Sequence, residues 1–381
     1  LWRRVASGLV GEAFSLSLSV GLPYSKASSS GGTKRRPLPP TAQTGPNREW
    51  NSMMNPTLTD GYGRRFEYLR LSLTDICNFR CTYCLPHVYR KGAGQPAELS
   101  VAEIGRLIAA FARLGLWKVR LTGGEPTLHP ELLDIAARVA STPGITKLVM
   151  TTNGYRLAER AKDYAVAGIS ALNISVDSLD PARFAAITGH DRLAEIIDGI
   201  AAARQAGITS IKLNSVLMRG VNDDELDAFI AFVQRHELTL RFIEVMRTND
   251  NPAFFERHHL AGEAIATRLS AMGWQQLPRE AGAGPAVDFA RSGEPGRIGI
   301  IAPYAKDFCA TCNRLRVSAR GKLHLCLFGD HGLDLRPLLQ RDDQHDALVE
   351  RIVAMTATKA PAHRLHDGNS GGTPHLASIG G

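Results

Sequence analysis

Three cysteines lie close together in the segment "CNFRCTYC", which covers residues 77 to 84. Cys77, Cys81 and Cys84 are separated by three and by two residues, and three thiols cannot all pair in one local disulfide. A tetrahedral zinc ion would need a fourth ligand. The spacing therefore favours an iron–sulfur cluster that three thiolates hold and that keeps one iron open to a ligand. A structural zinc knuckle is the alternative for this segment taken alone.

The remaining cysteines form a second set, at Cys309, Cys312 and Cys326. Zinc is an alternative here too, because His324 lies two residues from Cys326 and could complete a Cys3His site. On a strand, however, His324 would share a face with Cys326 but be displaced along it, which is awkward for one tetrahedral ion. Arg314 and Arg316 follow the second thiol, and guanidinium groups match the acceptors of phosphates and purines. The segment therefore predicts an anionic ligand beside a second cluster.

Short β-rich segments alternate with amphipathic helical patterns from residue 66 onward. We expect strands at residues 68–73, 118–122, 147–152, 171–176, 211–217 and 240–245. Helical patterns lie between them, at residues 100–115, 130–141, 192–207 and 222–236. The first of these begins with a capping box, in which Glu103 follows Ser100 by three residues.

Six β–α units in a row predict parallel strands that are joined by right-handed crossovers. We therefore expect an α/β fold, a partial (β/α)6 barrel of the TIM type, with the active site at the carboxyl ends of its strands. The chemically notable segments fall at these ends. They are the first cysteine set, "TGGEP" at 122–126, "TTNG" at 151–154, "SVDSLD" at 175–180 and "EVM" at 244–246.

The sequence divides into three parts. Residues 1–57 form a leader rich in Ser, Gly, Pro and basic residues, residues 58–289 form the barrel, and residues 290–381 form a C-terminal domain with the second cysteine set. We expect this last part to be a separate layer that closes the open side of the barrel. The leader suits either a disordered or misassigned extension of a cytoplasmic protein or, as the alternative, a transit peptide for the mitochondrial matrix.

The composition is that of an ordinary globular protein, with 44% hydrophobic and 22% charged residues in 381. No apolar run reaches the roughly 18 residues that a membrane span needs, so we expect no membrane partner. Of the net charge of +8, residues 1–50 carry +5, which leaves +3 for the rest and argues against nucleic acid as a general partner. Two matching cysteine sets with no leftover thiol indicate two metal clusters in a reducing compartment.

These motifs together resemble a known family. The C-x3-C-x2-C spacing with Tyr83 before the last cysteine resembles the radical S-adenosylmethionine (SAM) superfamily, as does the "TGGEP" turn after the second strand. From about residue 58 to 381 the chain is similar to the GTP 3′,8-cyclases of molybdenum cofactor biosynthesis. The similarity rests on "LRLSLTDICNFRCTYCLP", "KVRLTGGEPT", "NISVDSLD", "LRFIEVMRT" and "FCATCNRLRVSARGKLHLCLFG".

The resemblance implies a radical SAM enzyme with two 4Fe–4S clusters. The first cysteine set would hold the cluster that binds SAM and cleaves it to a 5′-deoxyadenosyl radical, and the open iron of the second cluster would contact the guanine of GTP. By resemblance, SAM would be bound by Tyr83, Gly124, Ser175 and Met246. GTP would be bound by Arg70, Arg120, Thr151, Lys212, Arg314, Leu315 and Arg316. The C-terminal Gly380 and Gly381 would enter the active site.

The residues support this nucleotide site in one respect. Arg70, Arg120 and Lys212 occupy alternate positions of predicted strands whose apolar neighbours point the other way, so they would line the barrel interior. An unpaired charge is costly there, and a triphosphate is a suitable partner. The sequence has no P-loop pattern, so scattered side chains would have to hold the nucleotide.

The implied reaction removes the ribose 3′-hydrogen of GTP and joins C3′ to C8, which gives (8S)-3′,8-cyclo-7,8-dihydroguanosine 5′-triphosphate. The implied partners are an electron donor and the enzyme that turns the product into cyclic pyranopterin monophosphate, and a homodimer is one arrangement that the resemblance allows. Two other hypotheses are a radical SAM peptide modifier and a non-enzymatic metal-cluster module that binds nucleic acid. The first usually has more cysteines in its auxiliary domain, and the near-neutral charge and the "GGEP" turn argue against the second.

Overall fold

A computed structural model describes residues 57–84, 96–280, 282–372 and 379. Residues 1–56 of the predicted leader lie outside this part of the chain, as do Gly380 and Gly381. The first six strands run parallel in the order of the chain. They are β1 (Tyr68–Ser72), β2 (Lys118–Thr122), β3 (Lys147–Thr152), β4 (Ala171–Ser175), β5 (Ser210–Leu217) and β6 (Thr239–Glu244). Each predicted strand is confirmed, with its ends displaced by one residue at most.

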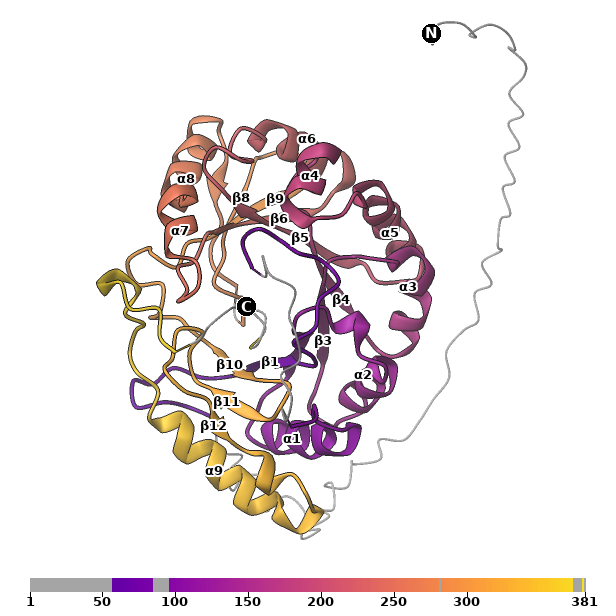
Figure 1. Ribbon diagram of the computed structural model, residues 1–381, viewed down its shortest axis with the longest axis vertical. Coiled ribbons are helices and arrows are strands. Elements are labelled where there is room, and N and C mark those ends of the chain that lie inside the picture. The colour runs from indigo at the N-terminus through magenta and orange to yellow at the C-terminus, as the bar shows by residue number, and fades with distance from the viewer. Residues whose placement is uncertain (1–56, 85–95, 281, 373–378, 380–381) are drawn as a thin grey trace, which may run out of the picture. The chain divides into compact units, whose positions relative to one another are not determined.

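Helices cover the outer face of this curved sheet, as the (β/α)6 prediction requires (Figure 1). They are α1 (Val101–Arg113), α2 (Leu132–Ala140), α3 (Leu157–Val166), α4 (Pro181–Thr188), α5 (Leu193–Gln205) and α6 (Leu226–His236), with a 3-10 turn at Pro126–Leu128. The predicted capping box of α1 is present, because the backbone N–H of Glu103 donates to Ser100 Oγ and that of Ser100 donates to Glu103 Oε2. Leu69 and Leu71 of β1 are fully buried among the apolar core residues, while Arg70 lines the central cavity.

The C-terminal part extends the same sheet at both edges. On one side, β9 (Arg297–Ile301) pairs parallel with β6, and β8 (Val287–Ala290) and β7 (Gln275–Gln276) follow in antiparallel order. On the other side, β10 (Arg314–Val317) pairs parallel with β1, followed by antiparallel β11 (Lys322–His324) and β12 (Leu333–Asp334). The expectation of a separate layer is therefore wrong, and residue 290 falls at the end of β8. Hydrophobic patterning indicates strands, but it does not indicate which earlier strand each one pairs with, such as β10 with β1, which lies more than 200 residues before it.

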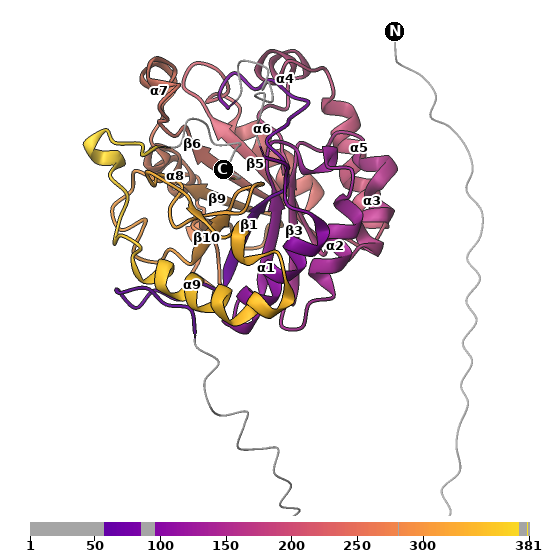
Figure 2. The same cartoon turned by 60° about the horizontal axis from the view of Figure 1, so that its bottom comes forward.

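The remaining helices are α7 (Pro252–His258), α8 (Gly262–Ala271) and α9 (His345–Ala357), with 3-10 turns at Arg336–Leu338, Asp342–Gln344 and Leu365–Asp367. Helix α9 lies beside α1 (Figures 1 and 2), where Arg106 pairs with Asp342 at 2.6 Å and Arg113 pairs with Asp346. These are exposed ion pairs, so they add little stability compared with the apolar contacts beneath them. No helix in the described residues is long and apolar enough to cross a membrane.

Candidate active site between two cysteine sets

A cavity of about 900 Å³ occupies the inside of the curved sheet, and all six cysteines line it. The strand register explains why basic side chains from distant segments meet there. Arg70 stands opposite Arg120 on β2 and opposite Arg316 on β10, so three guanidinium groups share one level of the sheet. Inward-facing residues of neighbouring parallel strands always meet in this way, because each strand presents alternate side chains to the same face.

The loop with the first cysteine set follows the carboxyl end of β1. Its backbone is tied to the end of α4, because the N–H groups of Arg80 and Thr82 donate to the carbonyls of Thr188 and Ile187, each at 2.9 Å. The Tyr83 hydroxyl donates to Asp177 Oδ2 at 3.1 Å, and the N–H of Val216 donates to Oδ1 of the same carboxylate at 2.8 Å. Burial raises the pKa of Asp177 to about 6, although these two hydrogen bonds oppose the rise. The loop is thus held from β4, α4 and β5.

The "TGGEP" turn packs directly against the segment before the first cysteine. The N–H of Gly124 donates to the carbonyl of Thr74 at 2.8 Å, and a Cβ at Gly124 would lie 2.2 Å from the carbonyl oxygen of Ile76. Only glycine permits so close an approach. The buried Glu125 accepts hydrogen bonds from Thr127, Thr152 and the N–H of Asn153, so the turn is also joined to "TTNG". The glycines of this motif are therefore needed by the fold itself, and Gly124 lines the cavity as predicted.

The second cysteine set lies at the opposite end of the barrel. Cys312 comes just before β10, which runs parallel to β1, and Cys326 comes just after β11, which runs antiparallel to β10. Both residues therefore lie where β1 begins, while the first set follows the point where β1 ends. The five residues of β1 separate these two ends by roughly 16 Å, at about 3.3 Å per residue. The cavity between the two sets is long enough for an extended ligand.

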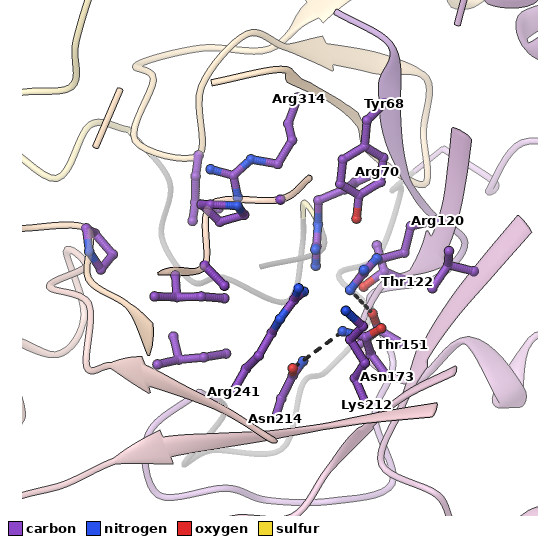
Figure 3. Close-up of a pocket in the computed structure, with 18 of the residues that line it drawn as sticks. Tyr68, Arg70, Arg120, Thr122, Thr151, Asn173, Lys212, Asn214, Arg241 and Arg314 are labelled. Carbon is purple, nitrogen blue, oxygen red and sulfur yellow. Dashed lines mark hydrogen bonds between the residues drawn. The ribbon is translucent and has the colours of Figure 1, made fainter. Parts of the chain in front are cut away.

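Cationic side chains fill the wall between the two sets. Figure 3 shows Arg70, Arg120, Lys212 and Arg241 pointing toward the same space, with Arg314 at its rim. Arg120 Nη1 donates to Thr151 Oγ1 at 3.1 Å, which brings two predicted ligands together. The buried Arg120 Nε and Arg316 Nη1 have no hydrogen-bond partner among the described residues. Unpaired buried donors are costly, so these atoms indicate a ligand with several acceptors.

The acid–base properties of the cavity follow from this crowding. Burial and, to a smaller extent, the nearby arginines lower the pKa of Lys118 and of Lys212 to about 8. Burial also lowers the pKa of Arg120, to about 10. Burial alone would raise the pKa of Tyr68, but Arg120 and Arg70 bring it down to about 8. All four shifts have the direction expected for a dense group of buried cations.

Sequence reasoning missed part of this cationic group. Lys118 is two residues before Arg120 on the same face of β2, and its Nζ lies 4.6 Å from the ring centroid of Tyr68. Arg241 projects into the cavity from β6, with Asp288 as an ion-pair partner at 3.8 Å. The alternation that identified Arg120 and Lys212 applies equally to Lys118 and Arg241, so the signal was present in the sequence.

The predicted site residues are brought together almost completely. Every predicted SAM-binding residue lines the cavity, and so does every predicted GTP-binding residue except Leu315. The side chain of Leu315, between Arg314 and Arg316, is fully buried in the apolar core on the other face of β10. His129, in the "TLHP" segment after the turn, is buried beside Glu98 and does not line the cavity. Gly380 and Gly381 lie outside the described residues.

The thiols fit polynuclear clusters better than single ions. Among the described residues, no three Cys, His, Asp or Glu side chains converge closely enough to hold one metal ion. Burial and Asp177 raise the pKa of Cys81 most, and Cys84 and Cys77 lie near enough to raise it further. In the same way, burial raises the pKa of Cys309, and the nearby Cys326 and Cys312 add to the rise. Within the described part of the chain, His324 completes no zinc site, and its buried Nδ1 has no hydrogen-bond partner there. Each set supplies three thiolates, one fewer than the ligands of a structural zinc ion and as many as hold an iron–sulfur cluster that keeps one iron open.

Comparisons with known proteins agree with this geometry. Residues 71–233 match the model of the radical SAM superfamily, and residues 238–365 match that of the molybdenum cofactor synthesis C family. The "GTP 3′,8-cyclase" of Stenotrophomonas maltophilia (strain R551-3) is 56% identical over 324 residues, which are 85% of this chain and 99% of that protein. The protein of the same name from Aeromonas hydrophila is 56% identical over 329 residues, which are 85% of this chain and 96% of the relative.

Among solved structures, SuiB of Streptococcus suis bound to S-adenosylmethionine has a TM-score of 0.56 at 11% identity, over 77% of this chain and 68% of that one. This likeness concerns the fold alone. The fold and the first cysteine set define a radical SAM protein. Within that superfamily, the chain belongs to the GTP 3′,8-cyclase family. Its cofactors are accordingly two 4Fe–4S clusters and SAM.

Proposed function

We propose that this chain converts GTP to (8S)-3′,8-cyclo-7,8-dihydroguanosine 5′-triphosphate, the first step of molybdenum cofactor biosynthesis. The observation that carries the proposal is a single cavity with a cysteine set at each end and a group of buried cations between them. In this class of enzyme, the bound cluster and SAM supply a 5′-deoxyadenosyl radical that abstracts a hydrogen atom from the substrate. The residues of the chain have to bind and orient the substrate and to exclude water.

We assign the two ends of the cavity to the two ligands. Tyr83, Gly124, Ser175 and Met246 surround the first cysteine set and would bind SAM there. The triphosphate would lie along the cationic wall, where its negative charge would stabilise the positive charges of Arg70, Arg120 and Lys212. Arg314 and Arg316 would hold the guanine end beside the second cluster, with Thr151 and the backbone of Leu315 as further contacts. This orientation would point the ribose toward the SAM end of the cavity.

The C-terminal glycines would complete the site. The preceding residue, Ile379, is 3% exposed and packs with Leu327, Phe328 and Leu365, and the neighbouring Met246 and Cys326 border the same apolar cluster. This anchor supports the proposal that Gly380 and Gly381 enter the cavity between the two cysteine sets. Glycine suits that position, because a backbone without side chains can pass between a nucleotide and several arginines.

The proposal also concerns partners and compartment. An electron donor would reduce the first cluster, and the product would pass to the enzyme that forms cyclic pyranopterin monophosphate. The bacterial origin of the relatives favours a cytoplasmic site of action over the mitochondrial matrix. A homodimer is compatible with this scheme and would be detected by sedimentation of the anaerobic protein.

Anaerobic reconstitution followed by incubation with SAM, dithionite and GTP tests the proposal directly. We expect 5′-deoxyadenosine, which carries away the 3′-hydrogen of GTP, and a product with the mass of GTP, because one electron from the reductant and one proton from water restore a hydrogen to the cyclised nucleotide. The product should differ from GTP in retention and in its C8 proton signal. ATP in place of GTP serves as the matched control for base recognition. Cleavage of SAM without any cyclised nucleotide would contradict the proposed reaction and would leave a different radical SAM activity.

A further inference from the structure

Lys359 is a buried cation in the wall of the cavity, and the residues assigned so far do not include it. It follows the C-terminal end of α9, is 4% exposed and lines the cavity together with the second cysteine set. Its Nζ donates a hydrogen bond to the carbonyl of Leu325, the residue before Cys326. The same ammonium lies 5.6 Å from the ring centroid of Phe66, which is a cation–π distance.

No carboxylate among the described residues lies within ion-pair distance of the Lys359 ammonium. A buried ammonium needs a compensating negative charge, and one carbonyl and one aromatic face compensate only part of the cost. The groups near it that can carry that charge are thiolates. Lys359 lies near enough to Cys312 and to Cys309 for its charge to act on both sulfur atoms.

A second buried cation fixes Lys359 relative to the cysteines. Arg64 donates to the carbonyl of Cys309 at 3.1 Å and to those of Ala360 and Pro361, each at 2.6 Å. Its guanidinium is oriented by Asp60, whose Oδ2 accepts from Arg64 Nε at 2.6 Å. One side chain thus ties the loop of Cys309 to the two residues that follow Lys359. A charge held in place in this way stabilises an anion without having to reorganise.

We propose that Lys359 is an electrostatic positioning residue of the second cluster. Its fixed positive charge stabilises the thiolate ligands and raises the reduction potential of that cluster, because a nearby cation favours the more negatively charged, reduced state. At the first cysteine set, the charged side chains that act on Cys77 and Cys81 are the carboxylates of Glu125 and Asp177. The inference rests on the proposed function only in assuming that both cysteine sets hold clusters.

The test compares Lys359→Met, which keeps the length of the side chain and removes its charge, with Lys359→Arg, which keeps the charge. Lys322→Met is the matched control, because Lys322 is an exposed lysine on β11 in the same part of the sheet. Each variant is made in the full chain and in a Cys81→Ala background that isolates the second cluster. Iron content and a potentiometric titration followed by electron paramagnetic resonance are the readouts, so turnover is not required.

We expect Lys359→Met to shift the midpoint potential of the second cluster to more negative values, while Lys359→Arg and Lys322→Met leave it unchanged. Loss of the second cluster in Lys359→Met alone, with full iron content in Lys359→Arg, would also support the inference. An unshifted potential in Lys359→Met, or loss of the cluster in both Lys359 variants, would overturn it, because charge would then not be the property that matters. A wild-type chain with a single cluster would instead refute the proposed function.

Discussion

The two cysteine sets use the same ligands in opposite electrostatic surroundings. Around the first set, burial raises the pKa of Cys77 to about 11, and the nearby Glu125 adds to the rise. Around the second set, Arg314 and Lys359 overcome the effect of burial and lower the pKa of Cys312 to about 7. The acidic end suits a ligand with an amino group, such as SAM, and the cationic end suits an anionic nucleotide. In the proposed assignment, ligand choice therefore depends on the residues around the thiols, since the thiols themselves are alike.

The largest effects should come from removing one cysteine at either end. We expect Cys81→Ala to abolish SAM cleavage, because the first cluster loses a ligand. Cys312→Ala should keep some reductive cleavage of SAM and lose all cyclised product. Both can be measured by quantifying 5′-deoxyadenosine and product in the same reaction. The comparison breaks down if Cys312→Ala stops SAM cleavage completely while the first cluster stays intact by iron analysis.

Removal of Gly380 and Gly381 should lower turnover nearly as much as the loss of a cysteine does. GTP binding should be affected much less. A chain that ends at Ile379 keeps the apolar anchor among Leu327, Phe328 and Leu365, so folding and both clusters should persist. We expect almost no cyclised product and GTP binding close to wild type, as measured by calorimetry. A chain with both glycines replaced by alanine is the matched control for length. Wild-type turnover of the shortened chain would show that Gly380 and Gly381 are not required for the reaction.

The arginines of the cationic end should act on GTP and leave SAM unaffected. Arg316→Ala and Arg314→Ala each remove a charge-assisted hydrogen bond, which is worth about 1.5–3 kcal/mol or roughly a 10- to 150-fold loss of GTP affinity. Replacement by lysine should rescue poorly, since lysine lacks the planar fork of donors. SAM affinity, measured in the same variants, is the internal control. Unchanged GTP affinity in both alanine variants would overturn the assignment of these residues.

The smallest expected effect is a pH dependence of GTP affinity that SAM affinity does not share. Lys118 and Lys212 have a pKa of about 8 in the free protein, and a bound polyphosphate would raise both. Binding near pH 8 should therefore take up protons, and GTP affinity should fall as the pH rises above 8, by at most about tenfold per unit for each lysine. Calorimetry in two buffers with different ionisation enthalpies measures the uptake. Lys212→Met should reduce it, and equal proton uptake in that variant would contradict this account.

Much of the barrel and of its site could be predicted from the sequence, for identifiable reasons. The six strands stand out because apolar alternation and flanking turn residues mark each one locally, and Ser100 with Glu103 marks the start of α1. Arg120 and Lys212 could be assigned because strand alternation decides which way a side chain points. The pairing of β10 with β1 could not be predicted, because nothing within β10 specifies so distant a partner. Lys359 and Arg64 were missed for the same reason, since their roles depend on contacts between distant loops.

The pairing of β1 with β10 has a consequence for the synthesis of the protein. Arg64 and Cys309 are 245 positions apart, and the edge of β1 stays open until β10 has left the ribosome. The six central strands can collapse earlier, but such distant pairings form slowly, since a long loop must close first. During that interval the first cysteine loop exists without its cationic counterpart. Until then the nascent chain lacks Arg314, Arg316 and the second set of thiols, so the proposed nucleotide site is incomplete.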